Sequence, residues 1–174
     1  MDTDKIEKQI LLQAPQKKVW RALSDAKQFG SWFGAKFDAP FEPGAKVHGA
    51  IMPTTVDPKV AKMQESHKGT PIKIEIEDTY RERLFSFRWH PYAIEVNRDY
   101  STEPMTLVEF SLEPAANGVW LTVTESGFDR LPTERREKAR AANETGWEKQ
   151  VHLIEAYLSR GKEAATSSGR GLLS

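Results

Sequence analysis

The chain of 174 residues is long enough for one well-buried core and short for two domains. Lysine and arginine together number 25, as do aspartate and glutamate, so the charge balance gives no electrostatic case for a nucleic-acid partner. The absence of cysteine excludes disulfides, thiolate nucleophiles and cysteine-ligated zinc. The acidic, charged N-terminus lacks the pattern of a secretory signal, and no stretch approaches the roughly 20 apolar residues of a membrane helix, so we expect a cytoplasmic protein with no membrane partner.

The first seventy residues predict a strand, two short helices and then a hairpin. Residues 6–13 mix apolar and charged side chains as a strand does, and Pro15 suits the first turn of the helix that follows. A second short helix ends before Gly34, and strands are expected at 36–41 and 45–52. Residues 53–71 contain three prolines and no clean period, which predicts a surface insertion with one helical turn.

The middle of the chain carries the clearest pattern, an alternation of apolar and polar residues. It occurs in four segments, at residues 72–77, 84–90, 106–113 and 119–124. Sheets with one wet face are antiparallel far more often than parallel. We therefore predict an antiparallel meander.

The longest helical pattern runs from Pro132 to about Arg160, with Gly161 after its end. One stripe on this helix has spacings of four, four, three and four residues and consists of Asn143, Trp147, Val151, Ile154 and Leu158. We predict a single domain over residues 1–161 and a disordered tail at 162–174, because the tail is small, polar and glycine-rich.

This order of elements predicts an α+β fold, in which a curved antiparallel sheet wraps around the long C-terminal helix and two short helices follow the first strand. A curved sheet and a straight helix touch along a line and diverge elsewhere. The space between them is either filled by large side chains or left as a cavity, and the residues leave both possibilities open.

Several short motifs resemble one family. They are AlaPro-x3-ValTrp-x-AlaLeuSerAsp at 14–25, TrpPheGly at 32–34, PheGluProGly at 41–44, PheSerPheArgTrpHisPro at 85–91, ThrLeuValGluPheSerLeuGlu at 106–113, ThrGluSerGlyPhe at 124–128 and GlyTrp at 146–147. Their order and spacing resemble the START-like helix-grip superfamily (SRPBCC), and within it the branch similar to the C-terminal domain of the activator of heat-shock protein 90 ATPase. The resemblance implies a container fold for hydrophobic molecules, cyclase or hydrolase chemistry in some members, and a link to a heat-shock protein 90 chaperone.

Glu125 is the sharpest candidate for chemistry. It continues the inward parity of Val119, Leu121 and Val123, so a straight strand would bury its carboxylate, where it could bind a ligand or act as a general acid or base. The alternative is that the strand ends near Ser126 and the carboxylate reaches solvent. We favour this second interpretation from the sequence, and no other residue is a catalytic candidate.

The remaining candidates are mostly inward-facing aromatic residues, because two indoles facing one space could stack a flat ligand. With Glu125, the predicted ligand-binding residues are Phe85, Phe87, Trp89, Phe110, Phe128, Trp147 and Val151. Arg88 and His90 have the opposite parity and are predicted to form an outer surface contact. The four histidines have no metal-ligand spacing and no glycine loop could cradle a phosphate, so we expect neither metal nor cofactor.

Three functions remain in competition. The leading hypothesis is a non-catalytic module that binds a small hydrophobic molecule in a cavity between the sheet and the C-terminal helix. The second, which rests on the resemblance, is a co-chaperone-like protein that stimulates a heat-shock protein 90 ATPase through its surface. The third is a cyclase- or hydrolase-type enzyme that uses Glu125 as general acid or base.

Overall fold

The fold is built on one seven-stranded antiparallel sheet. The computed structural model describes residues 3–93, 95 and 97–173, with side chains described as far as Arg160. The elements in chain order are β1 (Lys5–Leu12), α1 (Gln16–Ser24), α2 (Ala26–Phe33), β2 (Ala35–Phe37), β3 (Lys46–Ile51), α3 (Pro58–Glu65), β4 (Pro71–Tyr80), β5 (Leu84–Trp89), β6 (Thr106–Ala115), β7 (Gly118–Ser126), a single 3₁₀ turn (Phe128–Arg130) and α4 (Thr133–Leu173).

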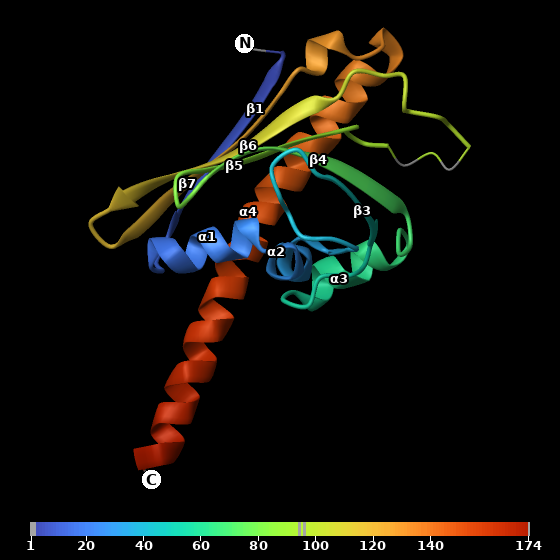
Figure 1. The fold of residues 1–174 in the computed structure, drawn as a ribbon. Helices are drawn as coiled ribbons and strands as arrows, with labels where there is room; N and C mark the ends of the chain where they lie inside the picture. Colours follow the sequence, from blue (N-terminus) through green and yellow to red (C-terminus); the bar gives the residue numbers. More distant parts are fainter. Residues whose placement is uncertain (1–2, 94, 96, 174) are drawn as a thin grey trace.

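The strands follow one another as a meander, and the first strand joins the last. The order across the sheet is β1-β7-β6-β5-β4-β3-β2, with every neighbouring pair antiparallel. A register shift in β4 between Ile76 and Thr79, opposite β5, interrupts the ladder, and the hydroxyl of Ser86 accepts a hydrogen bond from the Asp78 N–H there (3.0 Å). A bulge of this kind bends a strand, which helps the sheet to curve around α4. Figure 1 shows α4 lying across the concave side of the sheet.

The two short helices are set by local backbone chemistry. Pro15, at φ −61°, precedes α1, and the extended Asp25 separates α1 from α2. Gly34 ends α2 in the left-handed region (φ 98°), which glycine adopts without steric penalty. The indole of Trp32 donates to the carbonyl of Ala22 (2.8 Å), which holds the two helices together. Both helices were expected from the sequence and are confirmed.

The predicted stripe on α4 faces the core. Trp147, Val151, Ile154 and Leu158 are each less than 9% exposed, and they pack under the inward side chains of the sheet. The α+β helix-grip architecture predicted from the sequence is therefore confirmed. Within the insertion predicted at 53–71, the expected helical turn is the two-turn helix α3, which has no buried residue. The backbone of α4 is traced to Leu173, but the predicted disordered tail at 162–174 lies outside the residues whose side chains are described, and its disorder stays a prediction.

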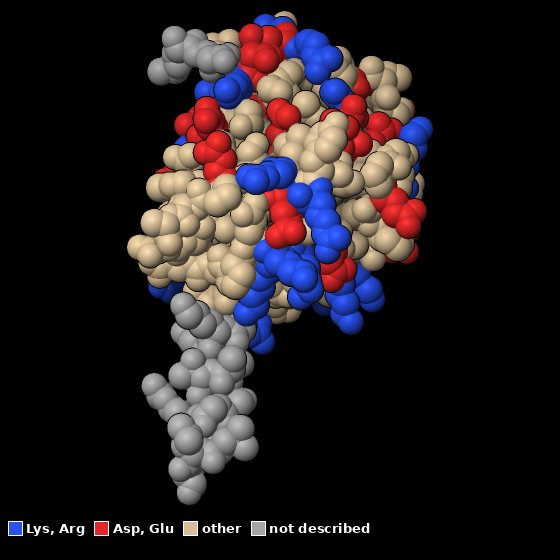
Figure 2. Space-filling model, turned by 60° about the vertical axis from the view of Figure 1, so that its left-hand side comes forward, with Lys and Arg blue, Asp and Glu red and all other residues tan. Residues whose placement is uncertain are grey.

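The surface is mixed in charge. Figure 2 shows one face, on which Lys and Arg side chains gather at the lower centre with Asp and Glu side chains among and around them. In the part of the chain that the structure describes, no helix combines the length and apolar character needed to cross a bilayer.

Candidate functional site

Glu125 lies in the interior of the domain. Strand β7 runs past it to Ser126, paired on one side with β1 (Ile6 opposite Glu125) and on the other with β6 (Val108 opposite Glu125). The alternation therefore holds to the end of the strand, and the Glu125 side chain is 0% exposed. The interpretation that we favoured from the sequence, a carboxylate in solvent at the strand end, is wrong because both neighbouring strands extend the ladder that far.

Four hydrogen-bond donors surround the Glu125 carboxylate. Trp89 Nε1 (2.8 Å) and Thr106 Oγ1 (2.6 Å) donate to Oε2. Asn143 Nδ2 (2.9 Å) and Trp147 Nε1 (2.8 Å) donate to Oε1. The donors come from β5, β6 and α4, so this one buried carboxylate on β7 connects strands β5 and β6 to the helix. We call Glu125 and these four donors the carboxylate cluster.

The predicted aromatic residues fill most of the space between sheet and helix. The side chains of Phe85, Phe87, Phe110 and Phe128 are each 0% exposed. The rings of Phe85, Phe87 and Phe110 lie against one another, and Phe110 also lies against Trp147, with 5.7 Å between their centroids. Trp147 and Val151 are also buried, at 3% and 6% exposure. These six predicted ligand-binding residues are thus packed as core, and Trp89 is the predicted residue that reaches an open surface.

The open surface is a cleft of about 980 Å³ at the end of the sheet. Trp89, Phe33, Asn143 and Gln150 lie along its α4 side, and β3, the start of β4 and the turn before β4 contribute its other side, with Gly49, Ile51 and Ile72 among the lining residues. The centroids of Trp89 and Phe33 are 6.0 Å apart, and those of Trp89 and Trp147 5.9 Å apart. Because Trp89 and Asn143 both line the cleft and both donate to Glu125, the carboxylate cluster lies directly behind the cleft.

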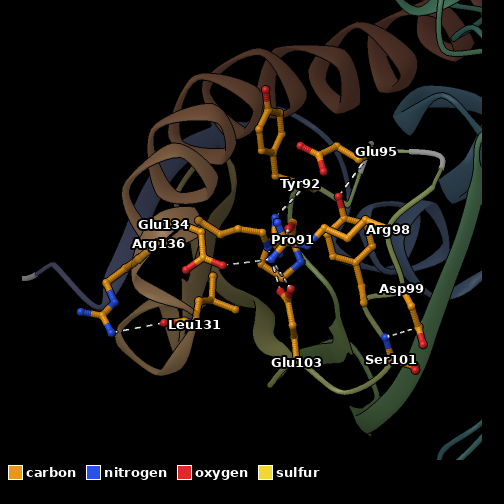
Figure 3. A network of polar contacts seen from close by, with 12 residues as sticks. Pro91, Tyr92, Glu95, Arg98, Asp99, Ser101, Glu103, Leu131, Glu134 and Arg136 are labelled. Atoms are coloured by element: carbon orange, nitrogen blue, oxygen red, sulfur yellow. Dashed lines mark hydrogen bonds and ion pairs between the residues drawn. The ribbon is translucent and has the colours of Figure 1, made fainter.

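The loop between β5 and β6 forms a further wall of the cleft, and Arg135 of α4 holds it. Arg135 is only 6% exposed. Its guanidinium donates to the carbonyls of Pro91 (2.9 Å) and Tyr92 (3.1 Å) and to the Glu103 carboxylate (2.8 Å). It also lies 4.7 Å from the centroid of the Tyr100 ring, a cation–π contact. The loop is therefore fastened to the first turns of the helix (Figure 3).

A second arginine extends this network. Arg98 donates to Glu103 (2.9 Å) and to Glu134 (3.3 Å), so the nearly buried Glu103 side chain is held between two guanidinium groups. The hydroxyl of Tyr100 accepts from the Glu95 N–H (3.1 Å). Tyr92, Glu95, Arg98 and Tyr100 all line the cleft, so the same contacts that fasten the loop also position a cleft wall. Figure 3 shows Arg98, Glu103 and Glu134 close together beside the first turns of α4.

Arg88 and His90, predicted together as an outer surface contact, lie in different places. Arg88 forms an ion pair with Glu77 (3.1 Å) and is partly exposed. His90 follows the last residue of β5, so the strand alternation no longer applies to it, and it lines the cleft. Its Nδ1 is buried and has no hydrogen-bond partner among the residues that the structure describes. Burial lowers the pKa of His90, an effect that Lys73 and Arg135 reinforce and that Glu103 and Glu75 oppose.

Sequence reasoning missed the clamp that Arg135 forms, its hydrogen bonds to the loop between β5 and β6. The basic run at 135–140 predicts a solvated helix face, which holds for the exposed Lys138 but is wrong for the buried Arg135. A signal was present, because Arg135 and Ala139 continue the stripe of Asn143 and Trp147 toward the N-terminus at intervals of four. The amides that line the cleft, Gln64 and Gln150, also escaped notice. Among the described residues, no group of three or more histidine or acidic side chains is arranged to hold a metal ion.

The fold and the cleft define a helix-grip protein, an α+β domain whose curved sheet holds a C-terminal helix. Residues 13–159 match the family described as "Activator of Hsp90 ATPase homolog 1-like protein", and the chain belongs to that family. This confirms the superfamily resemblance drawn from the motifs. No curated protein matches the chain.

Solved structures with the same fold are distant in sequence. A solution structure of a protein from Arthrobacter aurescens is 19% identical, with a TM-score of 0.70, and the match covers 92% of this chain and 90% of that one. Protein MLL2253 from Mesorhizobium loti is 19% identical with a TM-score of 0.66, covering 90% and 97%. DynU16, a protein of the dynemicin biosynthetic locus, is 23% identical with a TM-score of 0.64, covering 91% of this chain and 48% of DynU16. At these identities the likeness is one of fold.

Proposed function

We propose that this protein binds a small, largely apolar molecule in the cleft beside Trp89 and that it does so without catalysing a reaction. The observation that carries the proposal is the cleft of about 980 Å³, which lies at the upper end of the size range of small-molecule sites. Its lining combines aromatic rings, among them Phe33 and Trp89, with many polar and charged side chains, such as those of Lys73 and Arg98. Aromatic walls with polar groups that fix orientation are a feature of small-molecule sites. Aromatic side chains fill the space between the middle of the sheet and α4. We therefore propose the site at the end of the sheet, and not in the interior cavity that the sequence suggested.

The arrangement around Glu125 supports binding over catalysis. A general acid or base has to reach the proton that it transfers, at hydrogen-bond distance from the substrate. The Glu125 carboxylate is 0% exposed and already accepts four hydrogen bonds, and Trp89 and Asn143 stand between it and the cleft. We assign it a positioning role, in which it holds the Trp89 indole and the Asn143 amide in place.

Native mass spectrometry of freshly purified protein tests the proposal. We expect a co-purified small molecule in the wild-type protein and its loss in Ala93→Trp, which places an indole in the cleft wall. Ala116→Trp is the matched control, because Ala116 is exposed in the β6–β7 turn. The proposal fails if only the apo mass is found and if calorimetric titration with naphthol shows no binding up to about 1 mM, where binding corresponds to only about 4 kcal/mol.

Family membership supports a second candidate, a surface contact with a heat-shock protein 90. Arg88, partly exposed on the outer face of β5, is the predicted residue that remains available for it. If this candidate holds, adding the protein raises the ATPase rate of a cognate heat-shock protein 90, and Arg88→Ala weakens the stimulation. No change in that rate at saturating protein would exclude it, whatever the cleft binds.

A further inference from the structure

The ion pairs of this protein are distributed unevenly. Among the described residues, every ion pair joins groups of the sheet, the loop between β5 and β6, or α4. None of these pairs includes a residue of α1, α2 or α3. Figure 1 shows the three helices along one side of the domain, away from the N-terminal end of α4. Their charged side chains are therefore not neutralised by ion pairs.

The region of these helices is basic. Residues 16–33 and 57–68 contain seven lysines and arginines but three acidic residues, which gives a net charge of +4. Because the whole chain is neutral, its other residues carry a net charge of −4. All seven cations are exposed, and we call them the basic face: Lys17, Lys18, Arg21, Lys27, Lys59, Lys62 and Lys68. A surface with an excess of one sign attracts a partner of the opposite charge.

The stability of α1 does not explain the position of its cations. The N-terminus of a helix carries a partial positive charge, so cations in the first turn are unfavourable. Lys17 and Lys18 lie in the first turn of α1, which has neither an acidic residue there nor a side-chain cap. These two lysines are thus placed at a cost to the helix.

Helix α3 contributes little to the core. None of its eight residues is buried, and Val60 packs only partly buried against the core. Its outer face carries Lys59, Lys62 and Met63, which are exposed and lie on one side of the helix at spacings of three and four residues. Met63 is 56% exposed. A flexible thioether beside two lysines suits an apolar contact within a charged interface.

We propose that the basic face docks an acidic segment of another protein, with an apolar side chain of that segment against Met63. A single-stranded nucleic acid fits less well, because α1, α2 and α3 expose no aromatic side chain on which a base could stack. A bilayer also fits less well, because Met63 is the one large apolar side chain that the three helices expose and a membrane-bound helix needs an apolar face. The cleft plays no part in this contact.

Fluorescence anisotropy with a labelled synthetic peptide, glutamates around a central leucine, tests the proposal. We expect a dissociation constant below about 100 μM at about 50 mM NaCl and binding at least about tenfold weaker at about 300 mM. Lys62→Glu should weaken binding about threefold to tenfold, the effect of losing one or two exposed ion pairs.

Lys138→Glu is the matched control. Lys138 is also exposed and has no ion pair among the described residues, but it lies near the start of α4, on the far side of the domain. Its reversal should change the affinity by less than about twofold. Circular dichroism confirms that both variants fold.

Met63→Gln tests the apolar contact separately. It should weaken binding of the leucine peptide about twofold to fivefold, because a side chain that is half exposed in the free protein has only part of its surface left to bury. A peptide with glycine in place of leucine should bind wild type and Met63→Gln equally. An equal loss with both peptides would contradict the contact at Met63.

Three results would overturn the docking surface. They are no binding of the glutamate peptide up to about 1 mM, equal losses of affinity in Lys62→Glu and Lys138→Glu, and tighter binding of duplex DNA or of phosphatidylserine vesicles than of the peptide. Each of these results leaves the proposed function of the cleft intact, because none of the measurements uses the cleft.

Discussion

The space between the sheet and α4 is closed along the middle of the sheet and open at one end. Along the middle, Phe85, Phe87 and Phe110 alternate with outward residues on β5 and β6, and their fully buried rings fill the gap. At the end, β5 stops at Trp89 and the chain leaves the sheet as the loop that leads to β6, so no further strand residue fills the space. In this domain the open end of the space coincides with the end of β5.

The carboxylate cluster lies on the boundary between the two regions. Thr106 and Trp147 approach Glu125 from the core, and Trp89 and Asn143 approach it from the cleft. A boundary made of a single carboxylate is vulnerable, because one substitution leaves donors unpaired in a water-free environment. Substitutions there should affect core and cleft together, whereas substitutions in the loop should affect the cleft first.

The largest effect is expected from Glu125→Gln, which breaks the boundary. The amide nitrogen cannot accept, so at least one indole N–H loses its partner, and we expect a loss of about 2–4 kcal/mol in the free energy of unfolding. Urea unfolding followed by circular dichroism measures it. Glu113→Gln, an exposed position on the outer side of β6, is the control and should change stability by under about 0.5 kcal/mol. Equal free energies of unfolding for the two variants would show that the hydrogen bonds of the carboxylate cluster do not stabilise the fold.

A smaller effect, and one confined to the cleft wall, is expected from Arg135→Met. The substitution removes a buried cation, leaves the carbonyls of Pro91 and Tyr92 without this donor and leaves Glu103 with Arg98 alone. We expect a loss of about 2–3 kcal/mol in the free energy of unfolding, since an uncompensated buried partner is the main penalty.

Hydrogen exchange locates the effect of Arg135→Met. Amide exchange should rise in the loop between β5 and β6 and stay unchanged in β6 and β7. Arg136→Met is the matched control. Among the described residues the Arg136 guanidinium donates to the carbonyl of Leu131 alone (3.2 Å), and the residue is half-buried. A uniform rise in exchange across the sheet would contradict a clamp that acts on the cleft wall.

The sequence was most informative where side chains alternate. Four segments of alternating parity predicted β4 to β7, and the helical stripe predicted the inward face of α4, because burial of one face imposes a period that is visible in the residues. The parity of Glu125 was correct, and only the assumed strand end was misplaced. Strand ends depend on the neighbouring strands, here β1 and β6, which a local pattern does not contain.

The cleft could not be predicted in the same way. Its lining comes from α2, α3, β3, β4, β5, the loop before β6 and α4, segments that are spread along the sequence and share no period. Arg135 and Gln150 show the limit: each continues a helical face, but their contacts with Pro91 and Phe33 depend on tertiary packing. Six of the predicted ligand-binding residues accordingly lie in the core, because strand alternation and helical spacing identify residues that face the core.

The smallest effect is expected from pH, and it concerns His90 in the cleft wall. Burial lowers the pKa of His90, so in the folded protein it takes up a proton at a lower pH than in the unfolded chain, where histidine titrates near pH 6.5. As the pH falls below about 6.5 the unfolded state binds more protons, and the free energy of unfolding decreases until the folded-state pKa is passed. His90→Gln removes this term, so the difference in stability between wild type and variant should change between pH 7 and pH 5.5, with the wild type losing more. Urea midpoints at the two pH values measure it. A difference that does not vary with pH would mean that His90 is solvated, and that the loop leaves the cleft more open than the contacts of Arg135 indicate.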